Sequence, residues 1–475
     1  MEFSPAKIFD KKLLYLLIGF IALDAVSFLA YQSAWLGWLS FFILLVAAII
    51  IAAINLEYGV YILLSDLILG GLGYLFFIDV GGFRLPLRLG LFAGIFGVWL
   101  VKMILKNNWS FLKDKKILAL ILFGLFWLGS CAMGIFFGRS WSGIFFDANG
   151  YLYWGLLGLF LTVKIDFNRS LKVIFAGVYA LAIKTMLALA VFGYGWVWVG
   201  DNVFYKWLRD TRVGEITAIG EPLYRIFFQS QIYNLSVLLI VLCLLFLTDQ
   251  TFLNKKQKII LYFTAWLNLL IVLISGSRSF WVALAVVLVI LFGYLIYVKN
   301  LRQRFWPAVI FLVICLLTGQ LFVNIILNSY QVNLFFSRVG EAGSQASASS
   351  RRAQFLPLLS EIKKSPLWGQ GFAKTVTYFN SDPRINGYYT TDSFELNYLD
   401  MALKFGLIGL ICYFYLIGLI FFNSLKIFKS QSQFGFLSLI ILALLVTNVF
   451  TPYLNHPLGI GLLLLTAGLS GKKYS

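Results

Sequence analysis

Charged residues are scarce in this chain. Asp, Glu, Lys and Arg make up only 12% of its 475 residues, whereas 61% are hydrophobic, and the mean hydropathy is +0.88. Soluble globular domains need about twice this share of charged residues to cover their surface. The composition therefore excludes a soluble enzyme and predicts an integral membrane protein.

Histidine and cysteine are also rare. The single histidine, His456, excludes a histidine-based metal centre, and we expect it to cap or pack within a short outer turn. The four cysteines lie in apolar runs without the spacing of a disulfide framework or a zinc site, at Cys131, Cys243, Cys315 and Cys412. The acidic residues match no known metal-binding loop. We therefore expect no metal and no cofactor.

Apolar runs of about 20 residues recur along the chain, and this is the length at which a helix crosses a bilayer core. The sequence predicts an all-α polytopic membrane protein with about 14 spans (12–14). The expected spans lie near 13–30, 34–54, 58–78, 88–105, 117–138, 150–163, 173–193, 226–247, 259–275, 280–298, 306–327, 399–422, 434–453 and 457–471.

Basic residues concentrate in every second connection between these spans. Both terminal segments and the alternate loops hold 21 Lys and Arg against five Asp and Glu. The positive-inside rule assigns this side, with both termini, to the cytoplasm. The same rule explains the net charge of +18, so no nucleic-acid partner is expected.

Two outer loops are long and divide the chain. Residues 1–327 form the first set of spans and include the outer loop 194–225, residues 328–398 form a large non-cytoplasmic loop, and residues 399–475 form the last spans. In the large loop we expect 340–350 to be a flexible lead-in and 351–364 to be an amphipathic helix, ended by Ser365-Pro366. This loop carries seven Lys and Arg against five Asp and Glu, which favours an anionic ligand, although long loops can also escape the charge rule.

Two arginines stand where an anion could bind. Arg278 lies in Ser275-Gly276-Ser277-Arg278-Ser279, between two spans with almost no loop, so it must meet an anion, a carboxylate or water. The alternative is an arginine that snorkels to the interface. Arg351 opens the expected surface helix, where free N–H groups already favour an anion.

These elements, in this order, resemble the superfamily of O-antigen ligases and polymerases. The resemblance rests on Ser277-Arg278 after a span, the outer loop with Arg351, the 365–371 segment Ser-Pro-Leu-Trp-Gly-Gln-Gly, and Tyr398-Leu399 before Gly406-Leu407-Ile408-Gly409. It implies a GT-C-like glycosyltransferase that uses a polyprenyl-diphosphate-linked oligosaccharide on the outer face of the cytoplasmic membrane. Membrane lipids, and a flippase or chain-length regulator, would be its other partners.

The resemblance also implies site residues. Arg278 and Arg351 would bind the donor diphosphate, with Arg352, Arg212 and Arg225 as further candidates. Glu395 stands where ligases of the family carry a histidine, so it would be the catalytic base, and the swap favours a polymerase over a ligase. Glu395 could instead pair structurally with Arg278 or Arg351, and the charges of 210–225 could pair with each other.

Three alternatives stay open at this point. One is an O-antigen ligase that transfers glycan to a lipid or protein acceptor, and another is a peptidoglycan glycosyltransferase of the shape-and-division type. The third is a transporter or flippase of lipid-linked oligosaccharide, against which stands the lack of a visible internal repeat.

Overall fold

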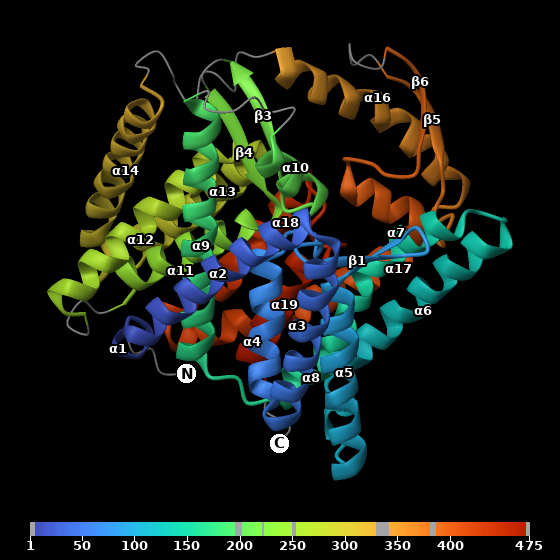
Figure 1. Ribbon diagram of the computed structural model, residues 1–475, viewed down its shortest axis with the longest axis horizontal. Coiled ribbons are helices and arrows are strands. Elements are labelled where there is room, and N and C mark those ends of the chain that lie inside the picture. The colour runs from blue at the N-terminus through green and yellow to red at the C-terminus, as the bar shows by residue number, and fades with distance from the viewer. Residues whose placement is uncertain are drawn as a thin grey trace.

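The computed structural model describes residues 5–194, 202–220, 223–248, 253–328, 342–380 and 386–471, and it is dominated by long helices (Figure 1). The first half contains α1 (Pro5–Ile8), α2 (Lys11–Gln32), α3 (Ala34–Ile54), α4 (Leu56–Leu69), β1 (Phe77–Val80), β2 (Phe83–Pro86), α5 (Leu87–Lys106), α6 (Lys115–Phe136), α7 (Trp141–Leu152), α8 (Leu157–Thr162), α9 (Phe167–Gly193), α10 (Val203–Asp210), β3 (Gly214–Gly220) and β4 (Leu223–Phe228). The second half contains α11 (Ile232–Phe246), α12 (Lys255–Ile274), α13 (Arg278–Tyr297), α14 (Phe305–Ile326), α16 (Ala342–Lys364), β5 (Val376–Asn380), β6 (Gly387–Thr391), α17 (Asn397–Ser430), α18 (Phe436–Thr447) and α19 (Pro457–Ser470).

The prediction of a polytopic all-α membrane protein is confirmed. Within the described ranges, 11 helical segments are long and apolar enough to cross a membrane. The other three expected spans are shorter helices, because α4 has 14 residues, α18 has 12 and α19 has 14. The span expected at 58–78 was too long, since α4 ends before Gly71 and Gly73, which adopt positive φ angles of 52° and 100°.

The interior of the bundle consists of helices that are apolar on every side. All residues of α11 are buried, and so is α19 from Leu458 to Leu469. Helices α2, α3, α5 and α14 bury only a minor part of their surface and expose Leu, Ile and Val side chains elsewhere. Such an apolar exposed surface is suited to contact with lipid, so the inner helices form the core and the outer ones meet the bilayer.

Three antiparallel hairpins, which the sequence analysis did not predict, lie in the connections. β1 pairs with β2, β3 with β4, and β5 with β6. In Figure 1, β3 to β6 and α16 lie at the upper end of the molecule, whereas the marks for both chain ends lie at the lower end. The two long connections therefore contribute to the same end of the bundle.

Helix α16 differs in part from the expectation. The helix itself is confirmed and ends at Lys364 before Ser365-Pro366, but it begins at Ala342, so the flexible lead-in expected up to residue 350 was wrong over its described part. Leu358 is fully buried in a small satellite core with Val376, Phe394 and Leu403. Helix α16 is therefore docked on β5 and α17 through this core.

The segment 366–371, which follows α16, contacts a kink in α17. Gly406 has φ 69° and ψ 176°, a conformation that is essentially restricted to glycine. The N–H of Gln370 donates to the carbonyl of Leu403 at 2.7 Å, and the N–H of Leu407 donates to the carbonyl of Pro366 at 2.8 Å. We call this joint the backbone clasp. It holds Gly369 and Gly406 in close contact. A Cβ on Gly369 would clash with the backbone of Lys404 and Gly406, and a Cβ on Gly406 would clash with the backbone of Leu367 and Gly369.

Candidate active site

The N-terminal end of α13 carries Arg278 on a tight corner. Ser275 ends α12 and its hydroxyl accepts a hydrogen bond from the N–H of Ser277 at 3.2 Å, while Gly276 has a positive φ of 56°. Ser277 is the N-cap of α13 and Arg278 is the first helical residue, half-buried. The corner therefore holds Arg278 where free backbone N–H groups and the helix dipole already favour a negative charge.

Arg225 on β4 lies against the same corner. Its Nε donates a hydrogen bond to the carbonyl of Ser275 at 3.1 Å, and its guanidinium lies 4.5 Å from the ring of Phe227. Phe227 packs in turn on Phe280 of α13, with ring centroids 5.9 Å apart. The structure therefore brings two of the predicted arginines, Arg225 and Arg278, to one corner although 53 positions separate them.

A short segment between α18 and α19 connects this corner to α16. The hydroxyls of Ser279 and Thr451 are 2.9 Å apart. The preceding residue, Phe450, lies under the guanidinium of Arg351, with 5.4 Å from Cζ to the ring centroid. We call residues 448–457 the connecting turn. The connecting turn therefore contacts Ser279, the neighbour of Arg278, and also Arg351.

Arg351 on α16 and Glu395, two residues before α17, form an ion pair. Arg351 Nε lies 2.8 Å from Glu395 Oε2, and the side chains keep 27% and 42% of their surface exposed. The N–H is not aligned for a hydrogen bond, so the contact is ionic. Gln354 on α16 accepts a hydrogen bond from the N–H of Glu395 at 3.2 Å and donates to the Tyr378 hydroxyl at 3.0 Å. The pair is thus well positioned yet open to a ligand.

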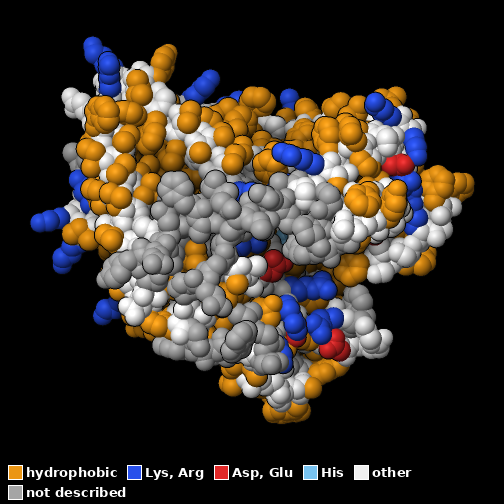
Figure 2. All heavy atoms as spheres, turned by 90° about the horizontal axis from the view of Figure 1, so that it is seen from above, with side chains coloured by type: hydrophobic (Ala, Val, Ile, Leu, Met, Phe, Trp, Pro, Cys, Tyr) orange, Lys and Arg blue, Asp and Glu red, His pale blue; other side chains and the backbone are white. Residues whose placement is uncertain are grey.

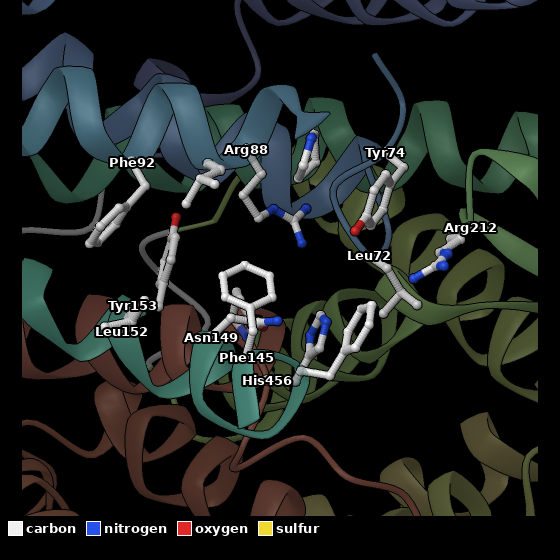
Figure 3. Close-up of a pocket in the computed structure, with 14 residues that line it drawn as sticks. Leu72, Tyr74, Arg88, Phe92, Phe145, Asn149, Leu152, Tyr153, Arg212 and His456 are labelled. Atoms are coloured by element: carbon white, nitrogen blue, oxygen red, sulfur yellow. The ribbon is translucent and has the colours of Figure 1, made fainter. Parts of the chain in front are cut away.

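The other two predicted arginines lie elsewhere. Arg352 is exposed beside Arg351. Arg212, with its guanidinium 4.8 Å from the ring of Tyr74, lines a separate cavity of about 230 Å³ that also contains Arg88 and His456 (Figure 3). Of the five predicted arginines, Arg212 alone lines this cavity, and the other four lie outside it.

His456 takes the structural part expected for it. It is the N-cap of α19, and its Nδ1 accepts a hydrogen bond from the N–H of Leu458 at 3.2 Å. Burial lowers the pKa of His456 to about 3, and the nearby Arg88 guanidinium lowers it further in the same direction. The ring is therefore neutral near neutral pH with its proton on Nε2.

Three asparagines that the sequence analysis missed, two of them fully buried and Asn455 partly buried, fix the connecting turn. Asn397, the first residue of α17, donates to Asn448 Oδ1 at 2.7 Å and accepts from Asn455 Nδ2 at 3.1 Å. Asn448 Oδ1 also accepts from the N–H of Tyr453 at 3.0 Å. Because buried amides must be paired, asparagines at the ends of apolar runs were the available signal. They tie the connecting turn to the helix that begins two residues after Glu395.

A buried ion cluster, also missed, joins α7 to α17. Lys404 Nζ lies 2.7 Å from Asp147 Oδ1 and 2.7 Å from Asp400 Oδ1, and all three side chains are nearly inaccessible. The second oxygen of Asp147 accepts a hydrogen bond from the N–H of Ala373 at 2.7 Å. Charges inside spanning segments need partners, and this was the sequence signal. Asp400 is therefore already engaged in the protein interior, unlike the exposed Glu395.

This end of the molecule has the charges of an anion-binding site. Figure 2 looks down on it and shows basic and acidic side chains around a hollow near the middle, with hydrophobic side chains over much of the rim. Arginine forks bind phosphate oxygens bidentately, and a nearby carboxylate can take a proton. The arrangement can therefore hold a phosphorylated group beside a base.

Comparison with known proteins agrees with the motifs. The family model described as O-antigen ligase matches residues 263–414, about a third of the chain. The match includes Arg278, Arg351, Glu395 and Gly406. A search of curated proteins gives no match. Residues 263–414 are therefore similar to an O-antigen ligase domain, which supports the resemblance of this membrane protein to the O-antigen ligase and polymerase superfamily.

Proposed function

We propose that this protein is a membrane glycosyltransferase that uses a polyprenyl-diphosphate-linked glycan as donor. The observation that carries the proposal is the continuous set of contacts from Arg225 and the Arg278 corner through the connecting turn to Arg351 and Glu395. Most of it lies within the residues matched by the family model. Three cations and one carboxylate beside a helix N-terminus suit a diphosphate and a reacting hydroxyl.

The chemistry follows from these groups. Oxygen of the acceptor hydroxyl attacks C1 of the donor sugar, the bond from C1 to the phosphate oxygen breaks, and its electron pair leaves with the lipid diphosphate. Arg278 and Arg351 stabilise the negative charge that develops on the leaving group, with Arg225 beside them and Arg352 at the edge. Glu395 takes the proton of the attacking hydroxyl.

The ion pair suggests an order of events. Arg351 and Glu395 neutralise each other, and both are partly exposed, so the pair contributes little to stability. A diphosphate carries more charge than a carboxylate and competes for Arg351. Donor binding would thus release Glu395 to act as a base.

The acceptor we propose is a second lipid-linked glycan, as in a polymerase, because Glu395 occupies the position of the ligase histidine. Transfer to another lipid or protein acceptor, as in a ligase, is the second candidate and uses the same donor chemistry. In either case the reaction takes place on the outer face of the cytoplasmic membrane, after a flippase has delivered the donor. A chain-length regulator would act on the product.

The substitution Glu395→Gln tests the base. It keeps shape and removes basicity, so we expect turnover to fall by about 10²–10⁴. Donor binding should persist or tighten, because Arg351 loses its competing carboxylate. The measurement is glycan extension by the full chain in lipid nanodiscs, with lipid-diphosphate oligosaccharide and no energy source, alongside donor affinity.

The matched control is Glu361→Gln, the same change on α16 at a carboxylate paired with Lys364 and Lys374 instead. It should retain turnover. Near-normal turnover of Glu395→Gln would exclude Glu395 as the base. A wild-type protein that moves lipid-linked glycan across the membrane without extending it would favour the transporter.

A further inference from the structure

The cavity that contains Arg212 lies between α5, α7 and the connecting turn, beside the proposed donor site. Its volume of about 230 Å³ is that of roughly eight water molecules. This is room for at least one sugar ring. Figure 3 shows the side chains that line it, among them Arg88, Phe92, Asn149, Tyr153, Arg212 and His456.

A buried hydroxyl in this cavity has no partner. Tyr153 is 3% exposed, and its Oη makes no hydrogen bond to any described residue. In Figure 3 the hydroxyl lies on the cavity side, near Phe92 and Arg88. An unpaired buried hydroxyl is unfavourable, so a ligand that pairs with it gains affinity.

Other groups in the cavity are suited to a sugar. His456 Nδ1 is used by the helix cap, so Nε2–H is the remaining donor of the ring. Asn149 adds an amide that can both donate and accept. Phe92, Phe145 and Phe146 supply apolar faces. A few placed polar groups among aromatic rings are typical of pockets that bind small molecules.

The cavity carries one uncompensated positive charge. Arg88 is neutralised by Asp66, with Nε and Oδ2 2.5 Å apart, and its Nη1 donates to the carbonyl of Gly71 at 2.8 Å. His456 is neutral. Arg212 lies over Tyr74, and among the described residues no carboxylate pairs with it. A ligand with a single negative charge would complement the site, whereas a diphosphate would exceed its charge.

We propose that this cavity binds one acidic sugar residue, with its carboxylate on Arg212 and its hydroxyls on Tyr153, Asn149 and His456. The inference rests on the proposed function, in which the sugar belongs to the acceptor glycan. The connecting turn supports this, because Phe450 and Thr451 contact the donor site while His456 lines the cavity. The connecting turn thus contributes residues both to the proposed donor site and to the cavity.

The probe is methyl β-D-glucuronoside, with methyl β-D-glucoside as the neutral comparison, added at millimolar concentration to the full chain in nanodiscs. Saturation-transfer NMR measures binding. We expect the glucuronoside to bind saturably and the glucoside to bind about tenfold more weakly or not at all. Arg212→Gln should weaken glucuronoside binding about tenfold.

Two further variants separate binding from folding. Tyr153→Phe removes an unpaired hydroxyl, so the thermal midpoint of the ligand-free protein should stay or rise while glucuronoside binding weakens several-fold. Arg209→Gln is the control for Arg212. It changes an arginine that also lies over a tyrosine, Tyr205, but that pairs with Asp210, and it should leave binding unchanged.

Each outcome decides the matter. Equal binding of the two glycosides overturns the acidic ligand, and absent binding, or binding unaffected by Arg212→Gln and Tyr153→Phe, overturns the site. Glucuronoside binding without any glycan transfer would refute the proposed function and leave the sugar site standing. Transfer without glucuronoside binding would refute the sugar site alone.

Discussion

At residue scale, His456 combines two demands that oppose protonation. Its ring is partly buried beside Arg88, and its Nδ1 must stay unprotonated to accept the hydrogen bond from Leu458. The pKa is about 3 in the folded protein and about 6.5 for an ordinary histidine. Below about pH 6.5 only the unfolded chain takes up the proton, so the stability from this group is complete above that pH and is lost as the pH falls toward 3.

The substitution His456→Asn tests this linkage. Asparagine is a strong N-cap and does not titrate, so the variant should keep the cap and lose the pH dependence. From about pH 7.5 to about pH 5 the wild type should lose about 2 kcal/mol more stability than the variant. Thermal unfolding at the two pH values, followed by tryptophan fluorescence, provides the comparison. An equal loss in both proteins would contradict the buried, neutral ring.

The order of the motifs was enough to predict the site residues, but the partners of these residues could not be predicted from the sequence. Arg351 and Glu395 were identified from the sequence, and the structure shows the ion pair kept as an alternative role for Glu395. Asn397 and Asn448 are 51 positions apart, and Lys404 and Asp147 are 257 apart. Nothing in one sequence pairs such distant groups, although each is conspicuous as a polar residue in apolar surroundings.

At element scale, α17 depends on its kink. Gly406 adopts a backbone conformation that other residues rarely reach, and a Cβ there would strike the carbonyl of Leu367. We expect Gly406→Ala to destabilise the protein by at least about 2 kcal/mol, because strain and clash add. Gly418→Ala is the control on the same helix, where a Cβ would meet only Phe422 at 3.9 Å.

The measurement is the thermal midpoint of both variants in the same detergent, with protease sensitivity of the outer segment as a second readout. Gly418→Ala should match the wild type or exceed it, since alanine favours the helix. A Gly406→Ala protein as stable as the Gly418→Ala protein would show that the clasp does not need the kink.

Elements were predictable where their signal is local. An apolar run of about 20 residues identifies a spanning helix by itself, which is why the long helices were found. The end of α4 was missed because Gly70–Gly73 lies within an apolar stretch that continues to Phe77. The hairpins were missed because strands of four to seven residues give a weak pattern, and their pairing is not written in either strand alone.

At the scale of the whole molecule, the arrangement predicts which end faces outward. α16 and the two hairpins formed by β3 to β6 lie opposite the marks for both chain ends, and the basic loops predict that the chain ends are cytoplasmic (Figure 1). In a background without native cysteines, Ser360→Cys on the exposed side of α16 should react with an impermeant maleimide in intact cells.

Ser110→Cys is the matched control. Ser110 is also exposed, but it lies in the connection between α5 and α6 that carries Lys106 and Lys113. It should react only after the membrane is permeabilised. The reverse pattern would invert the topology and remove the proposed site from the outer face.

The backbone clasp has a consequence for how far such a sequence can diverge. Its hydrogen bonds join main-chain groups of residues 366–371 and 403–408, so they do not depend on the side chains at those positions. Substitutions there can accumulate without loosening the joint, provided that Gly369, Gly371 and Gly406 remain. Distant relatives should therefore share little more than a sparse pattern of glycines at this joint, and a comparison weighted to overall identity would overlook them.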